Sequence, residues 1–412
     1  MRNGIPKLLR LAILVGLGFA MTLSAFNALM DPYLNLGMPR IPGLNARKPV
    51  AIRHEALAKG HDVIRARPRT LVLGSSPNDE GFDADDKAWP SDTRPVYNLA
   101  FAGGNTYMSY RLLQHALYHG PVKLVILGLN PDFFLTSVLA SPPKVPEFER
   151  RLAVQVDGIR NAEEGRQSAR DYISTIFSLN TLPDSFSTLI GNLTGDSLNM
   201  VSGRLELDSE RAVLWGTYRA FTLENLVDAR ALRGRDRSQY EMAMRSVKGI
   251  LDVCRKNGCE VILIINPLHA DKLEVLDRLG YWGAFENWKR DLLSLTFRDL
   301  NEPGNRFPLW DFASYDAYST ESVPADGRSM RWYTDCVHYN TALGSLIIGR
   351  VFGAGDSAFG ELLSRSNLES RLKSIRQAQL EYRTRQPADA QRAAILARSP
   401  ASFPPTTFRA DN

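Results

Sequence analysis

The sequence predicts an α/β protein with a doubly wound, mostly parallel sheet of five strands and helices on both faces, in a three-layer α/β/α arrangement. Three observations lead to this fold class. Five short apolar runs have the length and composition of buried strands, and helical patterns separate them. The stretch between the third and fourth runs shows no clear strand pattern, which predicts a helical insertion at about 131–235.

Composition and charge narrow the class of protein. The chain has 412 residues, 44% hydrophobic and 23% charged, which excludes collagen-like, disordered and coiled-coil proteins. The net charge of +5 is small for this length, and Lys and Arg do not gather in a run. A nucleic-acid partner is therefore not expected.

Residues 11–30 predict a transmembrane helix. They are uncharged and mostly apolar, and a helix of this length is about 30 Å long, enough to cross a bilayer core. Three basic residues, Arg2, Lys7 and Arg10, precede the segment, whereas the ten residues after it contain one basic residue, Arg40. The positive-inside rule then places the N-terminus in the cytoplasm and the main domain in a periplasm or outside the cell.

A cleaved signal peptide is the main alternative to this anchor. A small-x-small cleavage site is hard to find around residues 24–28, where Phe26 and Asn27 occupy the decisive positions. We therefore favour an uncleaved, single-pass anchor in the inner (cytoplasmic) membrane over a cleaved leader or a buried globular helix.

The next elements follow in order along the chain. The expected strands lie at 70–74, 95–100, 124–128, 260–265 and 307–312, and the expected helices at 46–66, 105–119, 237–257, 274–297 and 340–352. In a parallel sheet, ligands collect at the carboxyl ends of the strands, so the residues that follow each strand are the candidates for function.

Two further segments complete the predicted organisation of an α/β domain at 31–355. In the insertion, two sets of apolar residues recur at helical spacing, Tyr172, Ile173, Ile176, Phe177 and Leu179, then Phe186, Leu189 and Leu193. They predict a lid, a partner-docking surface or an extension of the core. A helix is expected within 356–385, and residues 386–412, rich in Pro, Ala, Ser and Thr, are expected to be disordered.

A candidate nucleophile follows the first strand, in the run Gly74-Ser75-Ser76-Pro77. A serine on a tight turn at a helix N-terminus lies where backbone amides stabilise negative charge, which favours attack on a carbonyl. The alternative is a helix cap, with Ser76 as N-cap, Pro77 at the first helical position and Asp79 in a capping box. No phosphate-binding glycine motif is present.

A candidate general base lies at the end of the same domain. Asp335 precedes His338 by three residues, so its carboxylate can hold the histidine Nδ1 proton and leave Nε2 for a serine. The alternative is a surface aspartate and a packed histidine.

Together, the two motifs resemble the SGNH (GDSL) hydrolase superfamily over about residues 70–345. Gly74-Ser75-Ser76 takes the place of Gly-Asp-Ser, with Ser76 at the position of the nucleophile, and Asp335 and His338 match the Asp-x-x-His motif. The resemblance implies a flavodoxin-like fold and a Ser-His-Asp triad. Because Ser75 replaces the aspartate of the motif, Ser75 stays an alternative nucleophile.

The resemblance also implies an oxyanion hole. The run from Asn98 to Asn105 looks like the glycine block of the family, and Gly128-Leu129-Asn130 matches its asparagine block, with Pro131 departing from the pattern. The implied donors are the Ser76 amide, the amide of Gly103 or Gly104, and the Asn130 side chain.

With its N-terminal membrane helix, the chain is similar to SGNH-like proteins of polysaccharide O-acetylation and teichoic-acid D-alanylation, which work beside a membrane-bound O-acyltransferase. The resemblance implies an acyltransferase or esterase that needs no cofactor and acts on acyl esters of an envelope polysaccharide. The alternative is a non-catalytic scaffold of the same fold that partners such an acyltransferase.

Other side chains are weaker candidates. His269 after the fourth strand, and Arg331 and Trp332 before the Asp-x-x-His motif, are possible substrate contacts. His115 and His119 have metal-like spacing but no clear third ligand, so no metal site is expected. Cys254 and Cys259 can form a disulfide or pack as small buried side chains.

Overall fold

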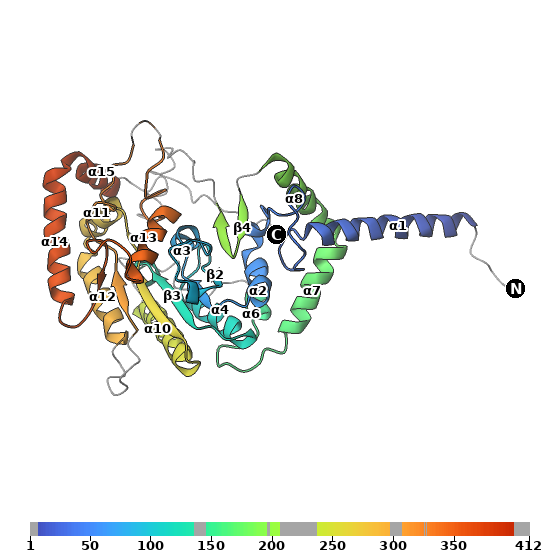
Figure 1. Cartoon of the computed structure of the whole chain (residues 1–412), viewed down its shortest axis with the longest axis horizontal. Coiled ribbons are helices and arrows are strands. Elements are labelled where there is room, and N and C mark those ends of the chain that lie inside the picture. The colour runs from blue at the N-terminus through green and yellow to red at the C-terminus, as the bar shows by residue number, and fades with distance from the viewer. Residues whose placement is uncertain are drawn as a thin grey trace. The chain divides into compact units, whose positions relative to one another are not determined.

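A computed structural model describes residues 7–135, 146–195, 198–206, 237–296, 307–324, 326 and 328–398 (Figure 1). The chain forms two compact units, and each is built from separate stretches of sequence. The first comprises 1–67, 114–120 and 143–208, and the second comprises 68–113, 121–142 and 209–412. The segment 31–355, expected as one domain with an insertion, is thus divided, because residues 31–67 belong to the same unit as residues 143–208 of the expected insertion.

The first unit is mainly helical. Its helices are α1 (Lys7–Met30), α2 (Glu55–Ala66), α6 (Pro146–Arg151), α7 (Glu164–Phe177) and α8 (Leu182–Thr194), with short 3-10 turns η1 (Ala51–His54) and η3 (Leu179–Thr181). A two-stranded antiparallel hairpin, β4 (Asn199–Val201) with β5 (Arg204–Glu206), lies where no strand was expected. The rest of the expected insertion, 136–145, 196–197 and 207–235, lies outside the described residues.

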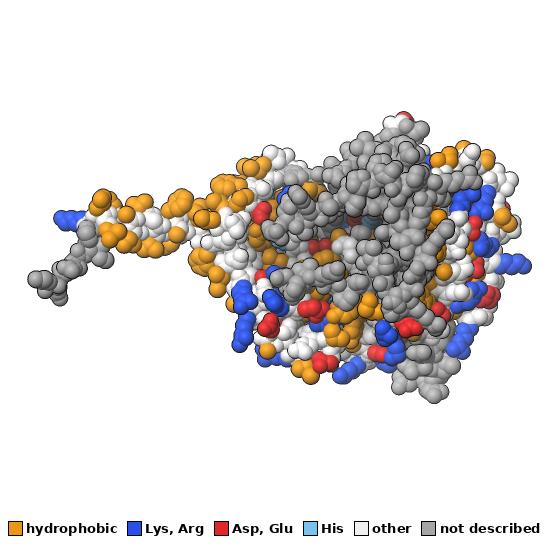
Figure 2. All heavy atoms as spheres, turned by 180° about the vertical axis from the view of Figure 1, so that it is seen from behind, with side chains coloured by type: hydrophobic (Ala, Val, Ile, Leu, Met, Phe, Trp, Pro, Cys, Tyr) orange, Lys and Arg blue, Asp and Glu red, His pale blue; other side chains and the backbone are white. Residues whose placement is uncertain are grey.

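Helix α1 is long and apolar enough to cross a membrane. Its most apolar window has a mean hydropathy of 1.9, and none of that window is buried within the structure. Hydrophobic side chains line α1 along its exposed length (Figure 2). Its last turns are held by other described residues: Asn27 Nδ2 donates to the carbonyls of Ile176 (3.3 Å) and Ser178 (3.2 Å), and Ser185 Oγ donates to Asn27 Oδ1 (2.8 Å).

The second unit contains a six-stranded sheet in the order β2-β1-β3-β6-β7-β8. All five predicted strands are confirmed and run parallel, as β1 (Thr70–Leu73), β2 (Val96–Asn98), β3 (Leu124–Leu129), β6 (Glu260–Ile265) and β7 (Leu309–Asp311). Strands β1 and β3 are buried along their whole length, which explains their continuous apolar sequence. The sixth strand, β8 (Glu361–Leu362), is antiparallel and too short to give a pattern.

Of the expected helices, those at 105–119, 237–257 and 340–352 are confirmed, and the one at 46–66 begins only at Ala51. Helices also connect the strands of the described sheet. They are α3 (Ser76–Gly81), α4 (Thr106–His119), α5 (Asp132–Leu135), α10 (Arg237–Lys256), α11 (Ala270–Arg278), α12 (Trp282–Thr296) and α13 (Thr341–Val351), with the 3-10 turn η2 (Ser91–Thr93) after α3. The single helix expected at 274–297 is wrong, since α11 ends before Gly280. Gly280 adopts φ +80°, a left-handed conformation that ends a helix.

The C-terminal region corrects the expected tail. Helix α14 (Leu368–Arg385) confirms the predicted helix, but Pro387–Arg398 form a further helix, α15, where disorder was expected from Gln386 onward. Ala390 and Ala393 are buried, and the Arg392 guanidinium binds the carboxylate of Asp271 on α11 at 3.0 Å. Residues 399–412 lie outside the described residues.

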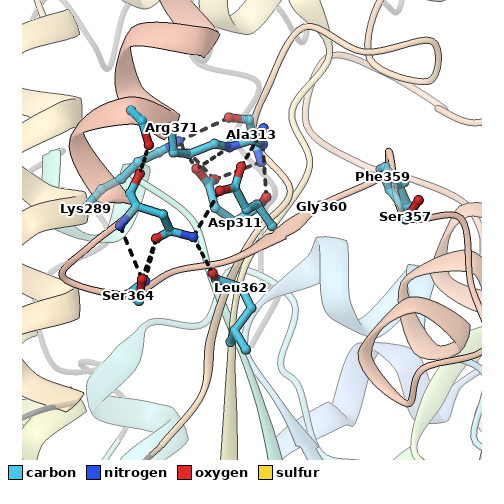
Figure 3. Close-up of polar contacts among 12 residues, drawn as sticks. Lys289, Asp311, Ala313, Ser357, Phe359, Gly360, Leu362, Ser364 and Arg371 are labelled. Carbon is cyan, nitrogen blue, oxygen red and sulfur yellow. Dashed lines mark hydrogen bonds and ion pairs between the residues drawn. The ribbon is translucent and has the colours of Figure 1, made fainter.

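A buried ion pair joins α12 to the end of β7 (Figure 3). Lys289 Nζ donates to both Asp311 carboxylate oxygens, at 2.9 and 2.8 Å, and to the Ala313 carbonyl at 3.1 Å. Both charged side chains are fully buried, and Arg371 of α14 lies 3.5 Å from the same carboxylate. The pair therefore ties two helices to the sheet.

Candidate active site

The carboxyl ends of the parallel strands gather polar residues at one edge of the sheet. Ser76 follows β1, Asn98 ends β2, Asn130 follows β3 and Asn266 follows β6. The strands themselves carry mainly apolar side chains into the core, so the polar side chains at this edge mark the candidate site. Their placement follows from the parallel topology alone.

The turn after β1 presents Ser76 at the start of α3. Gly74 has φ +147°, and a Cβ there would collide with the side chain of Asn78. Ser75, rather than Ser76, is the N-cap of α3, and its side chain makes no capping hydrogen bond. The alternative of a capping box centred on Ser76 is therefore wrong.

Asp335 and His338 share a tight hairpin. Its frame is the pair of backbone bonds from Thr334 N to His338 O and from Asn340 N to Trp332 O, both 3.0 Å. Inside it, Asp335 Oδ1 accepts from the amides of Val337 (2.7 Å) and His338 (2.8 Å). Asp335 Oδ2 lies 2.6 Å from His338 Nδ1. One carboxylate thus closes the turn and orients the imidazole.

The structure brings these residues to Ser76. His338 Nε2 lies 2.7 Å from Ser76 Oγ, across 262 residues of sequence. Ser76 is partly exposed, whereas Ser75 is 4% exposed and has no such bond to His338. The chain of contacts Asp335–His338–Ser76 has the geometry in which an imidazole can accept a proton from a serine.

Acidic neighbours set the charge of the imidazole. Burial lowers the pKa of His338, but Asp335 and then Glu80 outweigh it and raise that pKa to about 9. Burial raises the pKa of Asp335, but the charge and hydrogen bonds of His338 prevail and lower it. Glu80 Oε1 is 3.9 Å from His338 Nε2, and burial raises the pKa of Glu80 to about 7 against the opposing pull of His338.

Glu80 was missed in the sequence. It follows Ser76 by four residues, the spacing that places two side chains on one face of a helix. That spacing was the available signal.

The expected oxyanion donors differ in what they already bind. The Gly104 amide donates to the Phe101 carbonyl at 2.8 Å. Gly103 is exposed with φ +66°, and no described residue accepts a hydrogen bond from its amide or from that of Ser76. Phe101 N donates to Gly74 O (3.2 Å), which holds this loop beside the serine turn. The geometry favours Gly103 over Gly104.

Asn130 is held by a buried amide network that the sequence did not reveal. Asn266 Nδ2 donates to Asn130 Oδ1 (2.9 Å) and to Asn78 Oδ1 (3.0 Å), while Asn78 Nδ2 donates back to Asn266 Oδ1 (2.9 Å). Tyr339 Oη also donates to Asn266 Oδ1 (3.1 Å). Since the Asn130 oxygen is engaged, its Nδ2 is the group left to donate, and it has no partner among the described residues.

A second asparagine fixes α3 itself. Asn98 is fully buried, and its Nδ2 donates to the carbonyls of Asn78 (2.9 Å), Asp79 (3.2 Å) and Phe82 (2.9 Å). The end of β2 thereby holds the helix that carries Ser76. The sequence marked Asn98 only as the start of the glycine block.

His269 has a structural role, and its contact with substrate stays a prediction. It is fully buried, its Nδ1 accepts from the Asp271 amide (3.2 Å), and its Nε2 lies 2.7 Å from the Glu321 carbonyl. It serves as the N-cap of α11. Arg331 is exposed, with its guanidinium 4.6 Å from the centre of the Trp332 ring. Both precede the hairpin of Asp335, and their contact with substrate stays a prediction.

The remaining candidates lie elsewhere. His115 is buried in the first unit, with Nε2 2.9 Å from the Gly60 carbonyl and Nδ1 accepting from the Ala153 amide (3.0 Å). Both of its ring nitrogens are therefore engaged, and His119 Nε2 lies 3.8 Å from Glu164. The three cysteines, Cys254, Cys259 and Cys336, are buried, and none of them forms a disulfide in the described part of the chain.

Comparison with known proteins assigns no family to this chain. No protein-family model and no curated protein matches the chain. A solved structure from Streptococcus pneumonia, described as a candidate platelet activating factor, is 11% identical with a TM-score of 0.34, over 73% of this chain and 94% of that chain. A TM-score this low does not establish a shared fold.

Proposed function

We propose that this chain is an SGNH-like serine acyltransferase or esterase, anchored in the inner membrane through residues 11–30, with its main domain outside the cytoplasm. It acts on acyl esters of an envelope polysaccharide, acetyl esters first among them. The proposal depends above all on one observation, the two short hydrogen bonds that join Ser76 to His338 and His338 to Asp335. The polysaccharide substrate is supported only by the family resemblance.

The mechanism assigns each group a role. Ser76 Oγ attacks the ester carbonyl carbon and passes its proton to His338 Nε2, while Asp335 holds the Nδ1 proton and stabilises the imidazolium. The Gly103 and Ser76 amides and Asn130 Nδ2 bind the oxyanion. His338 then returns the proton to the departing alkoxide, leaving an acyl ester on Ser76. Water or a sugar hydroxyl repeats the sequence in reverse and releases the acyl group.

Two observations support the wider assignment. The order β2-β1-β3-β6-β7 is that of flavodoxin-like doubly wound sheets, whose ligands bind beside the switch point between the strands equivalent to β1 and β3. The unburied apolar window of α1 argues against a buried globular helix. The bonds of Asn27, and that from Lys48 Nζ to Met30 O (2.6 Å), argue against removal of α1 as a leader.

The test is a fluorophosphonate probe on the full chain in detergent, with the labelled residue identified by mass spectrometry. We expect labelling at Ser76 that is retained in Ser75→Ala. In His338→Ala it should slow by on the order of 10³-fold or more. Labelling at Ser75 would reassign the nucleophile. A folded chain that reacts neither with the probe nor with a short acyl ester would favour the scaffold that partners an acyltransferase.

A further inference from the structure

The first unit exposes an apolar face beside the base of α1. Its side chains come from α7, η3 and α8 and are 48–69% exposed: Ile173, Phe177, Leu179, Phe186, Ile190 and Leu193. We call this set the α7–α8 face. On α8 the residues are spaced as one helical stripe. Soluble proteins rarely leave so many large apolar side chains together in water.

Charge is nearly absent from this segment. Between Tyr172 and Gly195 the sequence holds a single charged residue, Asp184. Its carboxylate accepts from Tyr33 Oη at 2.6 Å and lies 3.9 Å from His54 Nε2, so it is held by the same unit. The six side chains of the α7–α8 face are all apolar, so the face carries no ionised group of its own.

The α7–α8 face is continuous with α1. The Phe26 and Phe186 rings pack with centroids 4.9 Å apart, and Asn27 bonds to the carbonyls of Ile176 and Ser178 at the corner between α7 and η3. Figure 2 shows hydrophobic side chains running along α1 and onto the adjoining surface of the same unit. Two apolar surfaces therefore meet at one place.

The length of α1 determines how deep in a bilayer the junction between α1 and the α7–α8 face would lie. The uncharged segment begins at Leu11, and α1 packs on its unit from Leu23 onward. The part that stands clear, residues 11–22, is about 18 Å long at 1.5 Å per residue. A bilayer core is about 30 Å thick, so this part alone is too short to cross it.

We propose that the α7–α8 face is embedded in the boundary between headgroups and acyl chains of the bilayer that α1 enters. The inference rests on α1 as a membrane anchor, which belongs to the proposed function. Seating the face there brings residues 23–30 into the membrane and completes the span. Interfacial helices bury their apolar face to depths of about 5–10 Å, which accounts for most of the missing length.

The basic residues of α7 fit this placement. Arg166 and Arg170 are exposed and precede Ile173 and Phe177 on the same helical stripe. Along α7 the stripe therefore passes from basic to apolar. Such an order sets guanidinium groups at the level of lipid phosphates and apolar groups below them.

The test measures depth in lipid. The full chain is reconstituted into nanodiscs of phosphatidylethanolamine and phosphatidylglycerol, with a nitroxide on a single introduced cysteine, Phe177→Cys or Leu193→Cys. Ile159→Cys is the matched control, because Ile159 is a 63% exposed apolar residue of the same unit. Leu14→Cys reports on α1. The three native cysteines are buried.

Collisions with oxygen and with a water-soluble nickel chelate separate the outcomes. We expect labels at 177 and 193 to show an oxygen-to-nickel ratio several-fold above that at 159, and Leu14 to show a higher ratio still. Water-like labels at 177 and 193 with a deep Leu14 would overturn the proposal, leave the anchor standing and point to a protein partner for this face. A water-like Leu14 would overturn the anchor itself.

Discussion

Asn78 occupies the space that a side chain at position 128 would need. A Cβ at Gly128 on β3 would collide with the Asn78 amide, and the same amide exchanges hydrogen bonds with Asn266 at 2.9 and 3.0 Å. Asn78 belongs to α3, which begins with Ser76. A glycine inside a strand thus leaves room for Asn78, a residue of the helix that carries the candidate nucleophile.

Gly128→Ala should therefore disturb both stability and reactivity. Its methyl group would displace Asn78, and overpacking of this kind typically lowers the free energy of unfolding by about 1–3 kcal/mol. We also expect slower fluorophosphonate labelling of Ser76. Urea unfolding and labelling rates measure the two effects. Gly283→Ala is the control, since a Cβ there meets nothing within 4 Å; equal behaviour of the two variants would contradict the prediction.

The labelling rate should rise with pH through the neutral range. A general base must be unprotonated, and the pKa of His338 is raised to about 9 once Asp335 and Glu80 outweigh burial. Below that pH the neutral imidazole increases about tenfold per pH unit, and the rate should follow. Rate constants for Ser76 labelling between pH 6 and 10 measure it. A labelling rate that stops rising below pH 7 would show that His338 loses its proton at a lower pH than expected.

Glu80→Gln should move this profile to lower pH. The substitution keeps the shape of the side chain but removes a charge 3.9 Å from His338 Nε2 that favours the imidazolium. At pH 7 the variant should therefore label faster than the unmodified chain, while the rates at pH 10 should agree. Slower labelling at every pH would instead mean that Glu80 takes part directly in the reaction.

Variants of Asn130 and Asn266 should distinguish a residue that binds the oxyanion from a residue that positions its neighbours. Asn130→Ala removes a proposed oxyanion donor, which typically lowers kcat by about 100- to 1000-fold with little change in KM. Asn266→Ala leaves the amide oxygens of Asn78 and Asn130 without their shared donor, so it should also lower the free energy of unfolding by about 1–3 kcal/mol. Ester hydrolysis and urea unfolding test both. Unchanged kcat in Asn130→Ala would remove it from the oxyanion hole.

Lys289→Met should be strongly destabilising without touching the site. It leaves the fully buried carboxylate of Asp311 without its closest cation, and breaking such a pair typically costs about 3–5 kcal/mol. The double variant Lys289→Met with Asp311→Asn should recover part of the loss. Lys248→Met, at a lysine 45% exposed, is the control for urea unfolding. A loss no larger than the control's would show that the pair contributes little.

The sheet was open to prediction because it depends on local pattern and parallel topology, whereas the meeting of Ser76 with His338 was expected from the resemblance of their motifs to the SGNH superfamily. Buried strands can be recognised in the sequence as apolar runs, and parallel strands bring their carboxyl ends to one edge of the sheet. The Asp335 turn is also local, since its acceptor and donors lie within three residues.

The parts that were missed depend on partners far away in the sequence. Asn78 and Asn266 are separated by 188 residues, and neither stands in an unusual local pattern. Helix α15 has small buried alanines and an arginine whose partner, Asp271, is 121 residues distant. Composition there resembles a solvated tail, and α15 is buried because it packs on α11 and α14.

The hairpin of Asp335 has a consequence for how such a site can be switched. The Asp335 carboxylate holds both the turn and the ring of His338. Asp335 and His338 therefore move together as one rigid pair. A conformational signal cannot part them without unfolding the turn. Within the series Asp335–His338–Ser76, the contact that can open while the turn stays folded is the 2.7 Å contact to Ser76, which joins α3 to a segment 262 residues later. A movement of α3 or of the hairpin would therefore separate the serine from its base while leaving the acid–base pair intact.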